Sequence, residues 1–480
     1  MLRQVLALFI IGGLTSSCSM QPIVPKTPSV DETYTQIQST TQPSNTYEQP
    51  TLKEGWWHAF NDPVLNRLIA QSIQANPNSL SALSTIREAR AYQNQINANS
   101  LPSVTASAGA NAQYSHETAT QTDSYSLGLD AQWEADLFNQ QSNATNSANA
   151  LLQASKADYA DLIISLSAEV ANTYFSLRQQ QQLLKLLHSS LQNWQETQQL
   201  VEWQARAGLE SQLAVEQAHR SYAQTEATIP DYLTAIAQSQ HQLAGLLGIN
   251  YKQLPKSLLA AQDLPIAPNI ESSQLPLEIL RKRPDVKAAE HRAQSAARQQ
   301  AVTQANLYPS FVLRGSLNNS AANLADLLSV NAFIASLTAS LSQTLFDNGQ
   351  RKSALIIAKE KTLQALLNYK KTVLSALSEV QLANTQRENA QQRLQKTLTA
   401  LTLANDEEAL ALLQYKIGQI AFSEVLSAQR TRLSLQQQYL TAQQSLLNYT
   451  ISFTKSTMGD WAWHQMQYVS PQATEDSNHE

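Results

Sequence analysis

The sequence contains little glycine and proline and a single cysteine. Among 480 residues there are 12 glycines, 16 prolines and one cysteine, Cys18. Scarcity of glycine and proline favours long uninterrupted helices over many short elements joined by turns. A single cysteine excludes a disulfide within one chain.

Charge and catalytic motifs are sparse as well. Charged residues make up 15% of the chain, and the formal net charge is -5. A nucleic-acid-binding protein carries a basic patch, so we expect no nucleic-acid partner. The sequence has no His-Glu-x-x-His motif, no paired His/Cys spacing, no glycine-rich phosphate loop and no Gly-x-Ser-x-Gly motif. We therefore predict that the protein is not an enzyme and has no cofactor and no metal site.

The longest stretch without breakers is residues 139–206, which contain neither proline nor glycine. Apolar residues recur there every seven positions, at Ile163, Val170, Leu177, Leu184 and Leu191. A sustained seven-residue repeat predicts one long helix with coiled-coil packing. Such a helix is about 100 Å long, and its many Gln, Asn and Ser residues exclude a lipid-embedded span. A second helix of this kind is predicted at 349–417.

The N-terminus has the pattern of an export signal. Arg3 supplies the positive charge, residues 5–14 form a short apolar core, and small residues precede Cys18. We assign residues 1–17 to a signal peptide. A sole cysteine directly after the signal resembles the lipobox of bacterial lipoproteins, although Thr15 replaces the usual leucine. The resemblance implies acylation of Cys18, including palmitate, and Ser19 implies sorting to the outer membrane; a cysteine merely near a cleavage site is the alternative.

Two segments are predicted to lie outside the folded part. Residues 18–55 are rich in Pro, Thr, Ser and Gln and lack apolar periodicity. They are interpreted as an extended lipidated tether. The tail at 464–480 is polar, and we expect it to be disordered.

An internal repeat organises the remainder. Residues 76–103 align with 283–310, residues 125–139 with 335–348, and residues 204–218 with 414–428. The nearly constant offset indicates duplication. We divide the chain into a first repeat at 56–250, a linker or equatorial segment at 251–274, and a second repeat at 275–463. Each repeat is predicted to contain a helix, two strands, a very long helix, a glycine turn and a shorter helix. The shorter helices are expected at 63–99, with a break at Pro77, and at 209–247, 275–306 and 421–457.

Alternating apolar and polar residues predict four strands, at 103–113, 124–133, 310–318 and 336–345. The pattern fits both a half-buried soluble sheet and the wall of an outer-membrane barrel. Tyr125 and Trp133 lie about 27 Å apart along a strand, which suits two interfacial aromatic girdles. Four strands cannot close, and an open edge in lipid leaves backbone groups unpaired. A barrel must therefore be shared between chains.

Several strings resemble a known family. They include WWHAFNDPVLNRLI, SLGLDAQWEADLFN, AEVANTYFSLR, RAGLESQLAVEQA, RPDVKAAEHRAQSA, QTLFDNGQR and YKIGQIAFSEVLSAQRTRL, in order over 56–463. Together they are similar to the TolC-like outer-membrane factors, in the NodT-type branch of efflux lipoproteins. The resemblance implies an α+β membrane protein, a homotrimer with a twelve-stranded β-barrel built from four strands per chain. A long α-helical barrel with a small mixed equatorial region would continue it.

The same resemblance implies a function. The protein would be the outer-membrane exit duct of a tripartite pump and extend into the periplasm. Its partners would be a periplasmic adaptor (membrane fusion) protein, an inner-membrane transporter of the resistance-nodulation-division type, and outer-membrane lipid. It would export drugs or other small toxic compounds passively, which confers multidrug resistance. Two alternatives remain open: a conduit for type I protein secretion, and a coiled-coil scaffold lipoprotein without a pore.

The glycine turns that end the two long helices are the first candidate sites. Gly208 and Gly418 are each expected to cap a helix in the left-handed conformation. By resemblance, these turns are the periplasmic tips that contact the adaptor, and we assign Gly208, Leu209, Gly418 and Gln419 to that contact.

A periplasmic gate is implied beside the second turn. By position, Tyr415 matches the family's gate tyrosine and Glu424 an acidic gate position. Ile420, Ser427 and Ala214 replace other family gate residues, so we expect the cross-links between neighbouring helices to be missing.

Two further charged groups are interpreted as structural. Asp406, Glu407 and Glu408 are expected to form a solvated helix face. Arg283-Pro284-Asp285 fits a helix start, with proline in the first turn and an acid facing the positive end of the dipole.

Overall fold

The computed structural model describes residues 55–117, 119–268, 277–329 and 333–457. The expected signal peptide, the acylation site Cys18, the tether up to residue 54 and the tail at 464–480 lie outside the described residues. The chain divides into two compact units. Unit 1 contains Ala89–Gln153 and Glu290–Asn368, and unit 2 contains the described residues up to Glu88, Ala154–Ala289 and those from Tyr369 onward. Each unit therefore combines parts of both predicted repeats.

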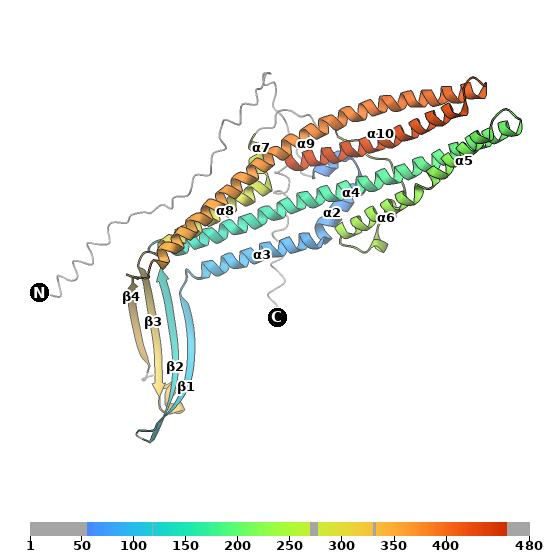
Figure 1. Cartoon of the computed structure of the whole chain (residues 1–480). Helices are drawn as coiled ribbons and strands as arrows, with labels where there is room; N and C mark the ends of the chain where they lie inside the picture. The colour runs from blue at the N-terminus through green and yellow to red at the C-terminus, as the bar shows by residue number, and fades with distance from the viewer. Residues whose placement is uncertain (1–54, 118, 269–276, 330–332, 458–480) are drawn as a thin grey trace. The chain divides into compact units, whose positions relative to one another are not determined.

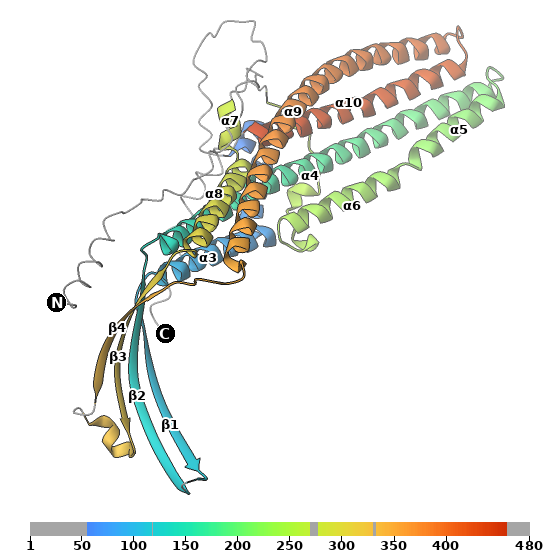
Figure 2. The ribbon, with the colours of Figure 1, turned by 60° about the vertical axis from the view of Figure 1, so that its left-hand side comes forward.

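Unit 1 contains an antiparallel four-stranded sheet (Figure 1). Its strands are β1 (Ser103–Ser115), β2 (Thr120–Ala135), β3 (Ser310–Ala321) and β4 (Ile334–Ser342), and they lie side by side in chain order (Figure 2). All four predicted strands are therefore confirmed. The fourth strand, predicted at 336–345, was extended three residues too far. The alternating pattern continues beyond Ser342, but the backbone there no longer pairs with β3. The side chain of Gln343 there donates to the carbonyl of Leu307 at 3.1 Å.

The register of the sheet separates two chemically different faces. Directly opposed residues of antiparallel strands lie on the same face. Leu129 lies opposite Leu317, and Leu313 lies opposite both Trp133 and Ala339. Most apolar residues of the four strands therefore share one face, with Val312 and Ile334 as exceptions. The other face is largely polar; Gln132, Arg314 and Thr338 form one of its rows.

The two long helices are confirmed. They are α4 (Gln140–Arg206) and α9 (Gln350–Lys416), each of 67 residues. Both begin in the same way, because an aspartate accepts hydrogen bonds from the first free backbone N–H groups. Asp136 accepts from Gln141 and Ser142 at 3.0 and 2.8 Å. Asp347 accepts from Gly349 and Arg351 at 3.0 and 3.1 Å. The two aspartates are not at equivalent positions of the repeat, since Asp136 precedes the aligned Leu-Phe pair and Asp347 follows it.

The shorter helices differ in part from the sequence prediction. The first is interrupted as expected, into α2 (Pro63–Ala75) and α3 (Pro77–Ala98), and α10 (Phe422–Thr457) is continuous. The helix predicted at 209–247 is instead two helices, α5 (Gln212–Glu226) and α6 (Ile229–Leu246). Pro230 stands at the second position of α6, and its missing N–H favours a new helix start there.

The helix predicted at 275–306 is divided as well. It consists of α7 (Leu277–Lys282) and α8 (Pro284–Ala305). Arg283 separates them, because a residue before proline is disfavoured in the helical conformation. Among the described residues, no helix has both the length and the apolar character needed to cross a membrane.

The main core of unit 2 surrounds the middle of α4. Trp56, Phe60, Tyr174 and Phe175 pack there with leucines of α2 and α6. Trp56 belongs to the short 3₁₀ helix η2 (Trp56–Phe60), and its indole N–H donates to Ser167 at 3.1 Å. The tryptophan-rich start of the first repeat is therefore part of the core.

A buried arginine secures the segment after α6 to this core. Arg178 is fully buried. Its guanidinium donates to the carbonyls of Ser257 and Ala260 at 2.9 and 2.7 Å and to the side chains of Gln181 and Gln262 at 2.9 and 2.8 Å. The segment contains two short 3₁₀ helices, η3 (Tyr251–Gln253) and η4 (Lys256–Leu258). One side chain thus satisfies several acceptors of a segment that has little regular structure.

Candidate functional site

The two glycine turns have the same geometry. Gly208 has φ 74°, and Gly418 has φ 75°. The N–H of Leu209 bonds to the carbonyl of Gln204, and the N–H of Gln419 to that of Gln414, both at 2.9 Å. This is the Schellman arrangement, which satisfies the last carbonyls of a helix and requires a left-handed residue. A Cβ at either glycine would meet no atom within 4 Å, so backbone conformation and not space selects glycine.

Large apolar side chains are exposed around both turns. Leu209 is 77% exposed and Leu213 67% at the first turn, and Ile417 is 61% exposed at the second. Trp203, in the last turn of α4, is 61% exposed. Exposed apolar groups that gather at a helix end are typical of an interaction site. The helix-cap interpretation of the turns is confirmed, whereas the assignment of Gly208, Leu209, Gly418 and Gln419 to an adaptor contact stays a prediction.

Tyr415 lies in a second core beneath the turns. It is 4% exposed and packs with Trp194, Val201, Phe422 and other residues of the ends of α4, α5, α9 and α10. Its ring lies 5.5 Å from that of Phe422, measured between centroids. A tyrosine buried to this extent needs a hydrogen-bond partner for its hydroxyl.

That partner is Glu210, and it corrects the sequence interpretation. The hydroxyl of Tyr415 donates to the carboxylate of Glu210 at 3.2 Å. Burial raises the pKa of Tyr415, and the neighbouring charge of Glu210 raises it further, so the hydroxyl remains a donor. The expectation that Tyr415 has no acidic cross-link partner was wrong. Ala214, the position that matches the family's acidic partner, is buried in the core. Glu210 instead follows Gly208 by only two residues. An acidic residue two positions after the glycine was the sequence signal that could have identified this partner.

The second gate candidate, Glu424, lies in a different environment. It is exposed in the first turn of α10. A carboxylate is favourable there because it faces the positive end of the helix dipole. The structure therefore brings Tyr415 and Glu210 together, and it leaves Glu424 on the surface of the chain.

The acidic cluster of α9 is not uniformly solvated, contrary to expectation. Asp406 and Glu407 are exposed. Glu408 forms an ion pair with Arg432 of α10 at 2.6 Å, and the two side chains are only 17% and 18% exposed. Burial raises the pKa of Glu408, and the charge of Arg432 partly opposes this. Helical periodicity directs Glu408 toward α10, a contact that a run of three acidic residues does not reveal.

The Arg283-Pro284-Asp285 string has a larger structural role than predicted. Arg283 is 7% exposed and forms ion pairs with Asp285 at 2.8 Å and with Glu379 of α9 at 2.7 Å. It also donates to the carbonyl of Ser456, near the end of α10, at 3.2 Å. Burial acts to lower the pKa of Arg283, but the two carboxylates outweigh it. Arg283 therefore joins the start of α8 to α9 and α10.

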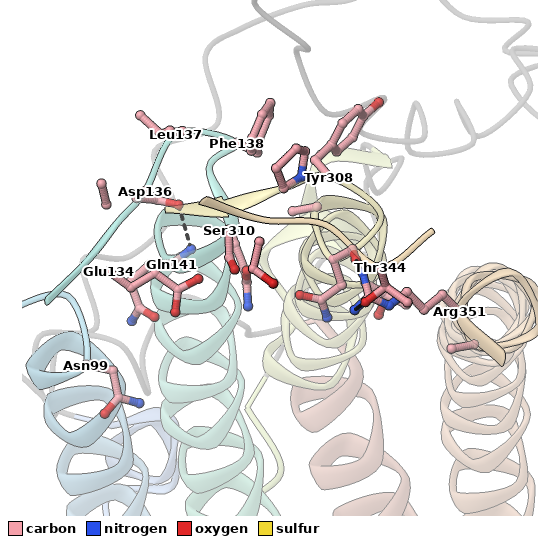
Figure 3. A pocket seen from close by; sticks show the side chains of 18 of the residues that line it. Asn99, Glu134, Asp136, Leu137, Phe138, Gln141, Tyr308, Ser310, Thr344 and Arg351 are labelled. Carbon is pink, nitrogen blue, oxygen red and sulfur yellow. Dashed lines mark hydrogen bonds between the residues drawn. The ribbon is translucent and has the colours of Figure 1, made fainter. Parts of the chain in front are cut away.

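A cavity of about 530 Å³ lies in unit 1 where strands meet helices (Figure 3). Its lining is mainly polar and includes Glu134, Asp136 and Arg351. Two of these charges already have structural partners. Asp136 caps α4, and Arg351 donates to Thr344 and, at 2.8 Å, to the carbonyl of Asn306. The cavity is best explained as the joint that holds the strand ends to the long helices.

Comparison with known proteins identifies relatives over most of the chain. The sequence model of the family described as outer membrane efflux protein matches residues 68–249 and 275–457. The probable outer membrane lipoprotein SilC of Salmonella typhimurium is 26% identical over 467 residues, which are 96% of this chain and 98% of SilC. The toluene efflux pump outer membrane protein TtgC of Pseudomonas putida is 26% identical over 485 residues, 99% of each chain.

Solved structures give the same result. The outer-membrane channel OprN is 32% identical, with a TM-score of 0.79 over 85% of this chain and 92% of OprN. The family consists of channel proteins rather than enzymes, and its sequence and fold extend over most of the present chain. The chain belongs to the outer membrane efflux protein family and acts in the outer membrane as an exit duct for efflux.

Proposed function

We propose that three copies of the chain form one duct, with a twelve-stranded barrel in the outer membrane and a barrel of long helices in the periplasm. The observation that carries this proposal is the two-faced sheet. Its apolar face is uncovered in the single chain, with Leu337 83% exposed, Val104 70% and Leu341 68%. A soluble sheet would bury such a face, whereas a barrel wall turns it toward lipid and its polar face toward an aqueous lumen.

The sheet edges support the same assembly. In the described part of the chain, β1 pairs only with β2 and β4 only with β3. Unpaired backbone groups are not tolerated in hydrocarbon. Pairing β4 of one copy with β1 of the next removes every edge after three copies, provided that the barrel closes at twelve strands. This size leaves room for an aqueous lumen, since it exceeds that of filled eight-stranded barrels.

The duct would operate as the outermost part of a tripartite pump. Its partners would be a periplasmic adaptor and an inner-membrane transporter of the resistance-nodulation-division type, and the adaptor would contact the turns at Gly208–Leu209 and Gly418–Gln419. Exposed Leu209, Leu213 and Ile417 suit contact with apolar residues of a helical partner. Cys18, outside the described residues, would carry the lipid anchor.

Transport would be passive and directed at small toxic compounds. Relatives are named for the export of toluene, antibiotics and cations, so one architecture serves chemically different cargo. This is expected if the energised partner selects the substrate and the duct only conducts it. The polar sheet face, rich in Ser, Thr, Asn and Gln, offers a wet surface of low specificity.

The tips would form the closed end of the duct. The Tyr415–Glu210 hydrogen bond ties the end of α9 to the turn after α4. Exposed Glu424 would contribute a ring of three carboxylates in the trimer and favour cations. Opening by the adaptor would then require that the link between the two helix ends be loosened.

Planar-bilayer recording of the purified assembly tests the proposal. We expect trimers by light scattering and discrete channel openings after insertion. Monomers under all conditions, or folded trimers that never conduct, would contradict it.

A further inference from the structure

The two hairpins of the sheet end differently. β1 ends at Ser115 and β2 begins at Thr120, so this connection is short. The β3–β4 connection is longer and contains a short 3₁₀ helix, η5 (Leu324–Leu328). This helix lies against β3 and β2 (Figure 2). It therefore packs on the sheet instead of projecting away from it.

Asn319 identifies the face on which η5 packs. Asn319 pairs with Leu127 and lies two residues after Leu317 in an uninterrupted register, so it belongs to the apolar face. It is nevertheless only 2% exposed, and its amide donates to the carbonyl of Leu327 in η5 at 2.6 Å. Leu127 is half-buried, whereas Leu129, one pair nearer to α4, is 48% exposed. η5 thus covers the apolar face at the end remote from the helices.

The sequence of η5 is amphipathic. With three residues per turn, Leu324 and Leu327 fall on one stripe and Asn323 and Asp326 on another. Leu327 is partly buried against the sheet, and Leu324 is 66% exposed. Asp326 and Asn323 are also exposed. A short segment with adjacent apolar and polar stripes is suited to the boundary between hydrocarbon and headgroups.

We propose that η5 is a lipid-contacting element in the outer leaflet, placed on the outer wall of the barrel and not over its mouth. This inference rests on the proposed barrel, in which the apolar face is turned toward lipid. An unpaired amide N–H on that face would be costly in hydrocarbon, and the carbonyl of Leu327 accepts from the amide N–H of Asn319 there, while the side-chain oxygen of Asn319 is buried without a hydrogen-bond partner. The exposed Leu324 then adds apolar contact with acyl chains. Together, the Asn319–Leu327 hydrogen bond and the exposed Leu324 would set how deeply this end of the barrel lies in the membrane.

Site-directed fluorescence in vesicles tests the position. Single cysteines labelled with a nitrobenzoxadiazole dye would be placed at Leu324→Cys, at Leu337→Cys on the apolar face, at Asn111→Cys on the polar face and at Glu117→Cys in the other turn. The assembled protein is reconstituted in phosphatidylcholine vesicles, with and without lipid that carries a nitroxide on its acyl chain. The unsubstituted chain measures any labelling of Cys18.

We expect nitroxide lipid to quench the Leu324 and Leu337 labels severalfold more than the Asn111 and Glu117 labels. Strong quenching at Leu337 with none at Leu324 would overturn the inference and leave the barrel intact. An unquenched Leu337 label would overturn the barrel orientation and the inference together.

Channel recording gives an independent measurement. A bulky thiol reagent should leave the conductance of the Leu324→Cys protein unchanged, while the same reagent should reduce that of Asn111→Cys. Reduced conductance after modification at Leu324 would place η5 over the lumen and refute the proposal.

Discussion

The two long helices have the same length and the same kind of start, yet the middle of one is covered by its own chain, whereas the other leaves a row of large apolar side chains exposed. Along the middle of α4, Val170, Phe175, Leu177 and Leu187 are at most 1% exposed. On α9, leucines and isoleucines spaced by seven residues remain on the surface. Leu403 and Leu410 are 64% and 58% exposed, Ile356 and Leu363 are 53% and 49% exposed, and Ile417, directly after the helix, is 61% exposed.

Duplication therefore produced two similar helices with different partners. The first acquired its neighbours within the chain, from η2, α2, α6 and the segment held by Arg178. The second kept an apolar stripe that requires a partner from outside the chain. An uncovered heptad stripe of this length is expected where helices of separate copies pack together. The difference between α4 and α9 is a second observation that supports the proposed assembly of several copies.

The largest effect should come from charging the uncovered stripe. Leu403→Glu with Leu410→Glu removes about 1.5 to 3 kcal/mol of burial for each leucine and introduces charge at every interface. We expect monomers by light scattering in detergent. Gln395→Glu with Asn405→Glu, at exposed polar positions of the same helix, is the matched control and should remain trimeric. A trimeric Leu403/Leu410 variant would show that the stripe is not an interface.

The covered helix is tested at Arg178. Arg178→Met leaves the carbonyls of Ser257 and Ala260 without their donors, and we expect a loss of about 3 kcal/mol in stability. The unfolding temperature of the assembly should fall by several degrees. Arg206→Met, at a residue whose side chain is 71% exposed, should leave it unchanged. Equal behaviour of the two variants would contradict the role assigned to Arg178.

A smaller, pH-dependent effect is expected where α9 contacts α10. Burial raises the pKa of Glu408, so the folded protein binds this proton more tightly than the unfolded chain, and stability rises as pH falls through the raised pKa. Arg432→Gln removes the opposing charge and should cost about 1 kcal/mol near neutral pH. The cost should disappear on acidification, when Glu408 is protonated. Unfolding temperatures measured across pH 4 to 8 test this, and a cost independent of pH would refute it.

The link between the ends of α9 and α4 should contribute less to stability but affect gating. Tyr415→Phe preserves the packing against Phe422 and removes one hydrogen bond, at a cost of about 1 kcal/mol. We expect more frequent openings in bilayer recordings with little change in unfolding temperature. Tyr439→Phe, in the middle of α10, is the control. An unchanged opening frequency would mean that Tyr415 has only a packing role in the core.

The smallest effect is expected at Glu424, which is exposed in the first turn of α10. Glu424→Gln should lower cation selectivity, measured as a shift of reversal potential in a salt gradient, while Glu407→Gln should not. Identical reversal potentials for all three proteins would make Glu424 an ordinary surface residue.

Much of the fold was predictable because it depends on local pattern. The two long helices were predicted to within one residue at each end, since neither contains a breaker and each ends at a glycine. The four strands followed from alternation. The errors arose where competing local signals occur, as at Pro230, which divides α5 from α6 within a continuous apolar pattern. The positions of Gly208 and Gly418 were correct because a left-handed helix end has a clear sequence signature.

The site was less predictable, because its decisive contacts join residues far apart in the chain. The Tyr415–Glu210 and Glu408–Arg432 pairs depend on which helix faces cross, and composition does not specify this. By itself the sequence determined the elements, their order, the two faces of the sheet and the family. Only the tertiary structure decided which long helix keeps an exposed apolar row, which acid meets Tyr415 and on which face η5 lies. Helix length and strand alternation are properties of neighbouring residues, whereas burial and pairing are properties of packed surfaces.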